Sequence, residues 1–405
     1  MQIIFAYGVL LLSPIVSFLY ALIGFYKTPS RWKRYLLFYI YFIFIAAYCY
    51  MPLEGSNVDL FRYYAILDEL KGMNLAETIG RLSDSLYVEN ILFWLVSKSN
   101  MYHILPAITT ATVYGIGAYI ACDMAQAEDF RYLYIILIIE AVMVPFFSVV
   151  VNIRNVFAFS LVILASYLEL YKQKRTLGVL LLYVIPVFLH KTGIVILIVR
   201  LLVPLFKRAY VVALVMIFGL SELIIFAHSH ITFIRFGGAF GRIIRKLINS
   251  SYRYLLGESE YAARVRNSTG AAITRYMVFA FLILMLALYI QKFRLNRKLL
   301  DFEIMGYMLC ILSLSCNVID TPAYWRFAAA FCLMIPSIMY SFYRGDLING
   351  NIKRLIRSGL AVYLVLRFMI MMQRASIDWM ETFSALAVTN IYTLIVQLVV
   401  SILTA

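Results

Sequence analysis

Charged side chains are scarce in this chain. Only 14% of its 405 residues are Asp, Glu, Lys or Arg, while 63% are hydrophobic and the mean hydropathy is +0.86. Soluble globular domains carry about 25% charged residues. The composition therefore excludes a soluble domain and predicts an integral membrane protein.

Several chemical signatures are also missing. The five cysteines lie in apolar runs without metal-ligand spacing, which argues against a zinc site or a disulfide framework. No Gly-x-x-x-x-Gly-Lys-Ser/Thr loop occurs, since the glycine-rich stretch 237–241 lacks the lysine, so no nucleotide or other cofactor is expected. The N-terminus has no basic segment ahead of its first apolar stretch, which is therefore expected to stay as a helix rather than be cleaved as a signal peptide.

Apolar segments long enough, or nearly long enough, to cross a bilayer recur along the whole chain. This pattern predicts an all-α, polytopic membrane protein with about 13 transmembrane helices, within a range of about 12–14. The expected helices are 2–25, 35–51, 102–122, 132–150, 154–171, 176–190, 192–206, 209–227, 272–291, 299–317, 324–343, 357–373 and 386–404.

Lysine and arginine in the short loops predict the orientation, because such residues are enriched on the cytoplasmic side. The predicted amino terminus is outside and the carboxyl terminus inside. Two long connections, 52–100 and 228–271, then face outside, and 86–100 is expected to be a surface or dipping helix. Neither a repeat nor a linker occurs, so residues 1–405 are expected to form a single transmembrane domain.

Polar side chains near the turns of three predicted hairpins are candidates for a site, since charges at membrane depth are costly. The hairpin between Arg175 and Lys207 has about 15 residues per limb, or roughly 22 Å of a roughly 30 Å core. Its apex is therefore expected to lie in a water-filled cavity below the outer surface. The candidates on this side are Asn152 and Arg154, His190 and Lys191, and Asp320 and Arg326.

Each candidate also has a structural interpretation. His190 could bond a neighbouring helix, Arg326 could extend to the membrane interface, and Asp320 could cap the helix that follows it. Their shared location on one side of the membrane favours a joint functional role.

The two outer loops add further candidates. The second loop is basic and interleaved with apolar residues, which fits either a helix on anionic headgroups or a clamp for a phosphorylated lipid. Its candidate residues are Arg242, Arg245, Arg253, Arg264 and Arg266. The first loop combines acids, an arginine and aromatic rings, a pattern that suits a carbohydrate site or a solvated loop with a helix cap; the residues are Asp59, Arg62, Tyr63 and Glu89.

Taken in order along the chain, these elements are Gly55-x-x-x-Asp59-x-x-x-Tyr63, Glu89 before an aromatic segment, Arg154 at the start of a span, His190-Lys191-Thr192 at an apex, and Arg326. In this order and topology the chain resembles the EpsG-like, Wzy-type polysaccharide polymerases of bacterial membranes. That family commonly has a shorter glycine-to-aspartate spacing, serine after the histidine pair and glutamine after the arginine, and this chain differs at all three places.

The resemblance implies a GT-C-like glycosyltransferase architecture in the bacterial inner membrane, with the site facing the periplasm or outside. Its substrates would be donor and acceptor oligosaccharides on undecaprenyl diphosphate, and its product an O-antigen, capsule or exopolysaccharide. Its other partners would be membrane lipid, a chain-length regulator and a flippase. No nucleic acid is expected as a partner.

The resemblance, together with the chemistry of diphosphate release, also suggests roles for the candidates. Arg154, Arg326 and Lys191 would neutralise the departing diphosphate, since the transition state develops charge there. The base candidates are His190, Asp59 and Asp320, because an acceptor hydroxyl must lose a proton. Glu89 is assigned to acceptor binding, and the remaining substrate-binding candidates are Arg62, Tyr63, Asn152 and the five arginines of the second loop.

Three other functions remain open at this point. A glycan ligase would share the donor but use another acceptor. A membrane O-acyltransferase could use an apical histidine, although its acyl donor normally approaches from the cytoplasmic side. A lipid-linked glycan flippase would favour inverted repeats, and none is detected.

The orientation can be tested with single cysteines. Cysteines placed at Ser56, Ser259 and Ser376 are expected to react with an impermeant thiol reagent added to intact cells, because the loop charges place all three outside. A cysteine at Asn296 is expected to stay unlabelled. Labelling of the Asn296 variant would reverse the orientation.

Overall fold

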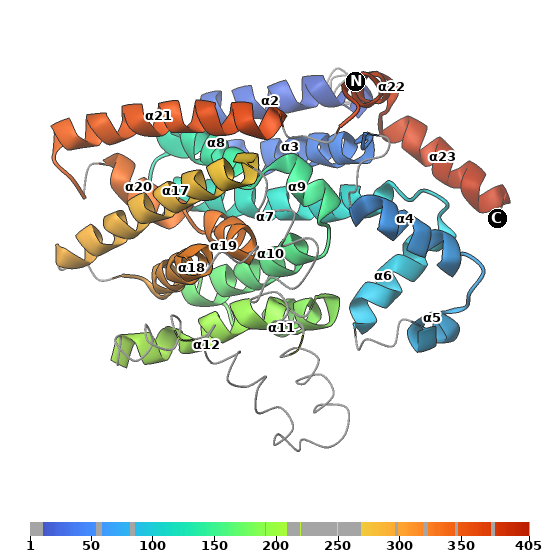
Figure 1. Ribbon diagram of the computed structural model, residues 1–405. Coiled ribbons are helices and arrows are strands. Elements are labelled where there is room, and N and C mark those ends of the chain that lie inside the picture. Colours follow the sequence, from blue (N-terminus) through green and yellow to red (C-terminus); the bar gives the residue numbers. More distant parts are fainter. Residues whose placement is uncertain are drawn as a thin grey trace, which may run out of the picture. The chain divides into compact units, whose positions relative to one another are not determined.

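The computed structural model describes residues 11–53, 59–81, 86–190, 192–208, 219, 249, 269–295, 299–318, 323–344, 347–373 and 377–404. These residues form an all-α protein with eighteen α-helices, so the predicted fold class is confirmed at this level (Figure 1). The one pairing of extended backbone among them is an isolated bridge between Pro52 and Ile377.

The chain forms two compact units, which we describe separately. The first comprises residues 1–161, 184–190 and 371–405, and the second comprises residues 162–183 and 191–370.

The first unit is organised around the long helix α7. Its described elements are α2 (Pro14–Lys27), η1 (Pro29–Arg31), α3 (Trp32–Tyr48), α4 (Asp59–Leu70), α5 (Leu75–Arg81), α6 (Tyr87–Lys98), α7 (Ile104–Ala127), η2 (Phe130–Tyr132), α8 (Leu133–Met143), α9 (Phe146–Val151), most of the first half of α10 (Asn155–Ser166), the end of α11 (Leu177–Leu189), α22 (Trp379–Val388) and α23 (Ile391–Thr404).

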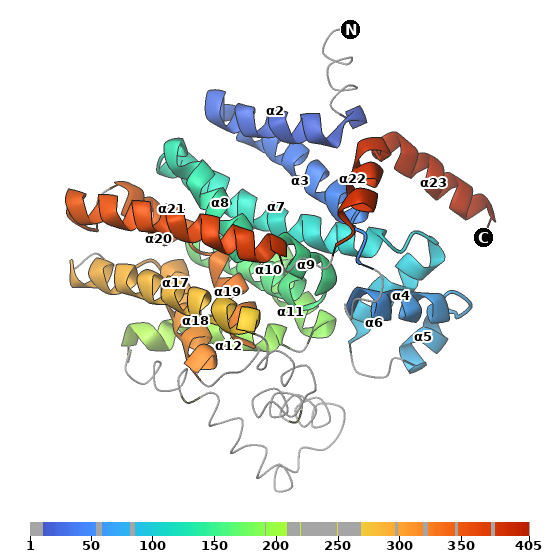
Figure 2. The same cartoon turned by 45° about the horizontal axis from the view of Figure 1, so that its top comes forward.

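Helix α3 lies beside both α2 and α7 (Figure 2). Helix α7 is buried around most of its circumference and is rich in Ala, Gly and Thr, which allow neighbouring helices to approach closely. Gly24 has the same effect in α2, because a Cβ there would overlap the ring of Tyr35 in α3. Small residues therefore set the helix spacing in this unit.

The second unit packs around α18. Its described elements are the end of α10, the π-helical turn η3 (Tyr167–Tyr171), the start of α11, α12 (Gly193–Arg208), α17 (Thr269–Arg294), α18 (Asp301–Val318), α19 (Ala323–Cys332), α20 (Pro336–Arg344) and α21 (Gly350–Gln373). Helix α18 contacts α12, α17, α19 and η3, and its side chains are almost all buried.

Three of the described helices are long and apolar enough to cross a membrane: Ile104–Ala127, Ala272–Arg294 and Gly350–Met372. Two bent helix pairs bring this number to five if each pair counts as one span. The count of about 13 stays a prediction, because other expected segments form shorter helices or, like 209–227 apart from residue 219, lie outside the described residues.

Three segments expected as single helices are broken. The segment 132–150 breaks at Val144–Pro145, because proline lacks an N–H and disfavours helical backbone in the residue before it. The segment 324–343 bends by 58° before Pro336. The C-terminal segment bends by 93°, where the Asn390 side chain accepts backbone hydrogen bonds from Tyr392 and Thr393 and so begins a new helix.

The expected surface or dipping helix within 86–100 does form a helix, α6. Its position relative to a membrane stays a prediction.

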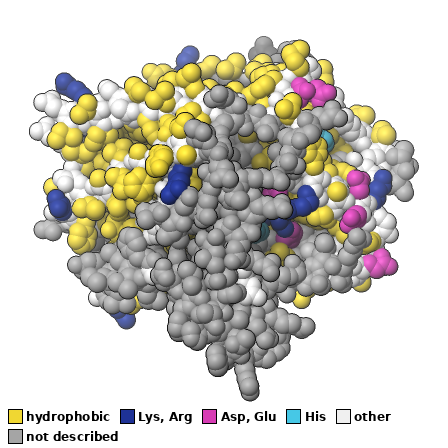
Figure 3. Space-filling model, in the orientation of Figure 1, with side chains coloured by type: hydrophobic (Ala, Val, Ile, Leu, Met, Phe, Trp, Pro, Cys, Tyr) yellow, Lys and Arg dark blue, Asp and Glu magenta, His cyan; other side chains and the backbone are white. Residues whose placement is uncertain are grey.

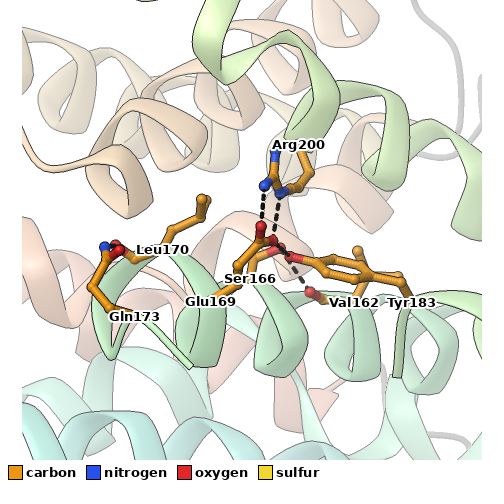
Figure 4. Close-up of polar contacts among 7 residues, drawn as sticks. All are labelled: Val162, Ser166, Glu169, Leu170, Gln173, Tyr183 and Arg200. Carbon is orange, nitrogen blue, oxygen red and sulfur yellow. Dashed lines mark hydrogen bonds and ion pairs between the residues drawn. The ribbon is translucent and has the colours of Figure 1, made fainter. Parts of the chain in front are cut away.

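Charged residues buried in the second unit include two close ion pairs. Lys292 Nζ of α17 lies 2.5 Å from Glu303 Oε1 of α18. Arg200 of α12 donates to both carboxylate oxygens of Glu169 in η3, at 2.9 and 2.5 Å, and Tyr183 of α11 donates to the same carboxylate at 2.7 Å (Figure 4). Such pairing offsets the cost of removing charges from water.

Glu169→Gln is expected to destabilise the protein, because it leaves Arg200 without its carboxylate partner. The two side chains are 18% and 15% exposed, so we expect a loss of about 2 kcal/mol, below the roughly 3–5 kcal/mol of a fully buried pair. Thermal unfolding of the purified protein in detergent measures this change. Arg131→Gln, which removes an exposed charge, is the control and is expected to leave the midpoint unchanged; equal midpoints for both variants would contradict the prediction.

Candidate functional site

An arginine, a carboxylate and a tyrosine meet in the first unit. Arg154 Nη1 lies 2.6 Å from Glu89 Oε1, and Arg154 Nε donates a 3.0 Å hydrogen bond to the hydroxyl of Tyr63. The Arg154 guanidinium carbon also lies 5.0 Å from the centre of the Tyr63 ring, within the range of a cation–π contact. We call these three residues the Arg154 cluster.

Local structure explains why these residues meet. Tyr63 lies with Leu60, Leu67 and Leu70 on the buried face of the amphipathic helix α4. Glu89 lies in the first turn of α6, on the same buried face as Phe93 and Val96. Arg154 occupies the turn between α9 and α10.

Burial limits the motion of the cluster. Glu89 is 6% exposed and Tyr63 2% exposed, whereas the Arg154 side chain keeps 26% of its surface open. The Phe93 ring meets Tyr63 edge-on at 5.7 Å. Burial raises the pKa of Tyr63 even though the neighbouring Arg154 lowers it, so the hydroxyl stays protonated and accepts from Arg154 through its oxygen. The guanidinium is therefore held on one side and accessible on the other.

Asp59 and Arg62 lie at the exposed side of the same helix. Asp59 Oδ1 is 3.3 Å from Arg62 Nη2, and both side chains are open to solvent. The Arg62 guanidinium carbon lies 5.4 Å from the Tyr63 ring centre. The sequence prediction placed Asp59, Arg62, Tyr63 and Glu89 in the first outer loop and Arg154 at a hairpin turn. The structure brings Tyr63, Glu89 and Arg154 into direct contact.

Three other predicted residues have local partners. Asn152 Nδ2 donates to the Ser148 carbonyl one turn earlier. The backbone N–H of His190 donates to Pro186 in the last turn of α11. Arg326, in the second unit, is 7% exposed and its guanidinium carbon lies 5.6 Å from the Trp325 ring centre.

Seven predicted site residues lie outside the described residues: Lys191, Asp320, Arg242, Arg245, Arg253, Arg264 and Arg266. Convergence of the full predicted set on one site stays a prediction.

The predicted site omitted some buried polar residues that the structure identifies. Glu140, in the apolar helix α8, is 5% exposed and lies within electrostatic range of Tyr39, Tyr114 and Cys122. A carboxylate inside an apolar run is a detectable sequence signal. In the second unit, Arg275 donates to the Asn317 carbonyl at the end of α18, at 3.1 and 2.7 Å, which suits the negative end of a helix.

No group of three or more His, Cys, Asp or Glu side chains that could hold a metal ion occurs among the residues placed by the structure. Comparisons with protein-family models, with curated proteins and with solved structures find no match.

A double-mutant cycle tests whether Arg154 and Glu89 act as a unit. Glu89→Gln, Arg154→Gln and the double variant are compared by thermal and chemical unfolding in detergent. We expect a coupling free energy of at least about 1 kcal/mol, because each single variant leaves a buried partner behind. The exposed pair Asp59 and Arg62 is the control, with Asp59→Asn and Arg62→Gln coupled by about 0.5 kcal/mol or less. Additive effects of the Glu89 and Arg154 variants would show that they do not support each other.

Proposed function

We propose that the protein polymerises undecaprenyl-diphosphate-linked oligosaccharide repeat units at the outer face of the bacterial inner membrane. In this reaction a hydroxyl oxygen of the acceptor attacks the anomeric carbon of the donor glycan, and the bond from that carbon to the diphosphate breaks. Undecaprenyl diphosphate leaves with the bonding electrons, and the acceptor proton passes to a base. The finer architecture, about 13 spans with outer loops 52–100 and 228–271, belongs to this proposal.

The Arg154 cluster is the observation that carries the proposal. Diphosphate departure needs a positive group with N–H donors already oriented at the leaving oxygens. Arg154 meets this need because, among the described residues, Glu89 and Tyr63 engage Nη1 and Nε, and Nη2 would face a phosphate oxygen. A planar guanidinium suits such contacts better than an ammonium group does.

The pairing with Glu89 adds a role to the one expected from the sequence. Glu89 was assigned to acceptor binding, and its Oε1 also bonds Arg154, so in this proposal it holds the guanidinium in place. A carboxylate also lets the arginine remain buried before substrate binds. The base candidates remain Asp59, His190 and Asp320, and Arg326 and Lys191 remain candidates for further phosphate contacts.

A substitution that keeps the positive charge but removes the planar guanidinium with its several N–H donors tests this role. Arg154→Lys is expected to abolish polymer and to accumulate single repeat units on lipid, at normal protein level, because lysine cannot donate from Nε and Nη positions at once. The readout is the lipid-linked oligosaccharide profile of a deletion strain carrying each variant. Arg131→Lys, at an exposed turn, is the matched control and should restore full polymer.

Other outcomes separate the competing functions. Intact polymer left unattached in the deletion strain would indicate a ligase. Repeat units trapped on the cytoplasmic side would indicate a flippase. Full polymer from the Arg154→Lys variant would remove the case for a catalytic arginine.

A further inference from the structure

A second group of side chains in the first unit has no part in the Arg154 cluster. The rings of Tyr64 and His103 lie 5.3 Å apart, and Tyr64 and Tyr102 lie 6.1 Å apart. The His103 ring also lies 5.7 Å from Tyr48. Tyr102 donates a 2.6 Å hydrogen bond to Asp68 Oδ1. We call Tyr48, Tyr64, Tyr102, His103 and Asp68 the aromatic patch.

The patch is partly open to solvent rather than sealed in the core. Its four rings are half-buried and Asp68 is exposed. Figure 3 shows charged side chains gathered over helices α4 to α6, at the right of the view. Three of the five exposed residues of α4 are charged, namely Arg62, Asp68 and Glu69. The rings therefore border a water-facing surface, which distinguishes them from aromatic residues that face only lipid.

Helix α4 connects the patch to the Arg154 cluster. Tyr63 contacts Arg154, while the next residue, Tyr64, contacts His103. Successive residues of an α-helix point about 100° apart, and a helix with its side chains is about 10 Å across. A ligand reaching from one site to the other would thus have to span roughly one helix diameter, which an oligosaccharide of a few sugars can do.

We propose that the aromatic patch binds the glycan part of a lipid-linked substrate, several sugars away from the diphosphate. This inference rests on the proposed polymerase function and assigns it a substrate subsite. The glycan's apolar ring faces would stack on Tyr64 and Tyr102, and its hydroxyls would bond Asp68.

The chemistry of the patch suits a neutral, hydroxyl-rich ligand. Asp68 accepts from Tyr102 through Oδ1 and carries a second carboxylate oxygen for a sugar hydroxyl. The His103 imidazole is already engaged, since its Nδ1 lies 3.4 Å from the Tyr64 hydroxyl, and it orients that ring. Hydrogen bonds among Tyr64, His103, Tyr102 and Asp68 fix the rings before any ligand binds, which reduces the entropy lost on binding.

Polymer length tests the proposal. Tyr102→Ala is expected to give short polymer and to raise the KM of the lipid-linked donor about tenfold, the loss of about 1.4 kcal/mol of ring contact, with kcat little changed. Tyr102→Phe keeps the ring and should restore length. Tyr87→Ala is the matched control, because Tyr87 is an exposed tyrosine of α6 outside the patch, and it should make full-length polymer.

A photocrosslinker gives a readout that needs no turnover. With p-benzoylphenylalanine at position 102, the full-length protein is mixed with oligosaccharides released by mild acid from the lipid-linked glycans of the producing strain. We expect sugar adducts at position 102 and none at position 87. Adducts with phospholipid alone, together with full-length polymer from Tyr102→Ala, would overturn the proposal and make the patch a membrane-interface contact.

The two proposals fail in different ways. An inactive Arg154→Lys variant combined with full-length polymer from Tyr102→Ala and no sugar adducts would remove the subsite and leave the polymerase. Full polymer from Arg154→Lys would instead undermine the phosphate site, whatever the patch binds.

Discussion

The free-energy cost of removing charged groups from water is the main constraint on this structure, and the ion pair between Arg154 and Glu89 shows how it is met. A guanidinium held among apolar helices is stable only with a partner of opposite charge and filled hydrogen bonds. Glu89 and Tyr63 provide both within 3.0 Å. The same contacts that make the charge tolerable also fix its direction. In the function we propose, the contacts that stabilise the guanidinium in the fold are therefore the same contacts that orient it toward a diphosphate.

The same constraint is met differently elsewhere. Lys292 and Glu303 neutralise each other inside the second unit, and Arg200 shares the Glu169 carboxylate with Tyr183 (Figure 4). Arg275 instead uses the carbonyl dipole at the end of α18. These pairs are enclosed between helices, whereas Arg154 keeps a quarter of its side chain open. In the function we propose, that combination of fixed geometry and access makes Arg154 the charge that meets the diphosphate.

The sequence predicted the helical class, because long apolar runs dictate helices. It also named Tyr63, Glu89 and Arg154 as separate site candidates, but it did not predict that the three side chains touch. Helix breaks were missed because hydropathy averages over Val144–Pro145 and over Asn390, where a single residue redirects the backbone. The partner of Glu89 was also missed, since 65 residues separate it from Arg154 and only the packing of α6 brings the two together.

We propose that this chain forms a glycosidic bond while releasing a lipid diphosphate. Reconstitution of the purified protein in liposomes with lipid-linked repeat units is the most direct test, with polymer and free undecaprenyl diphosphate measured together. We expect one equivalent of undecaprenyl diphosphate for each repeat unit added, without any nucleotide. Movement of intact lipid-linked units across the bilayer with no new bond and no free undecaprenyl diphosphate would contradict it.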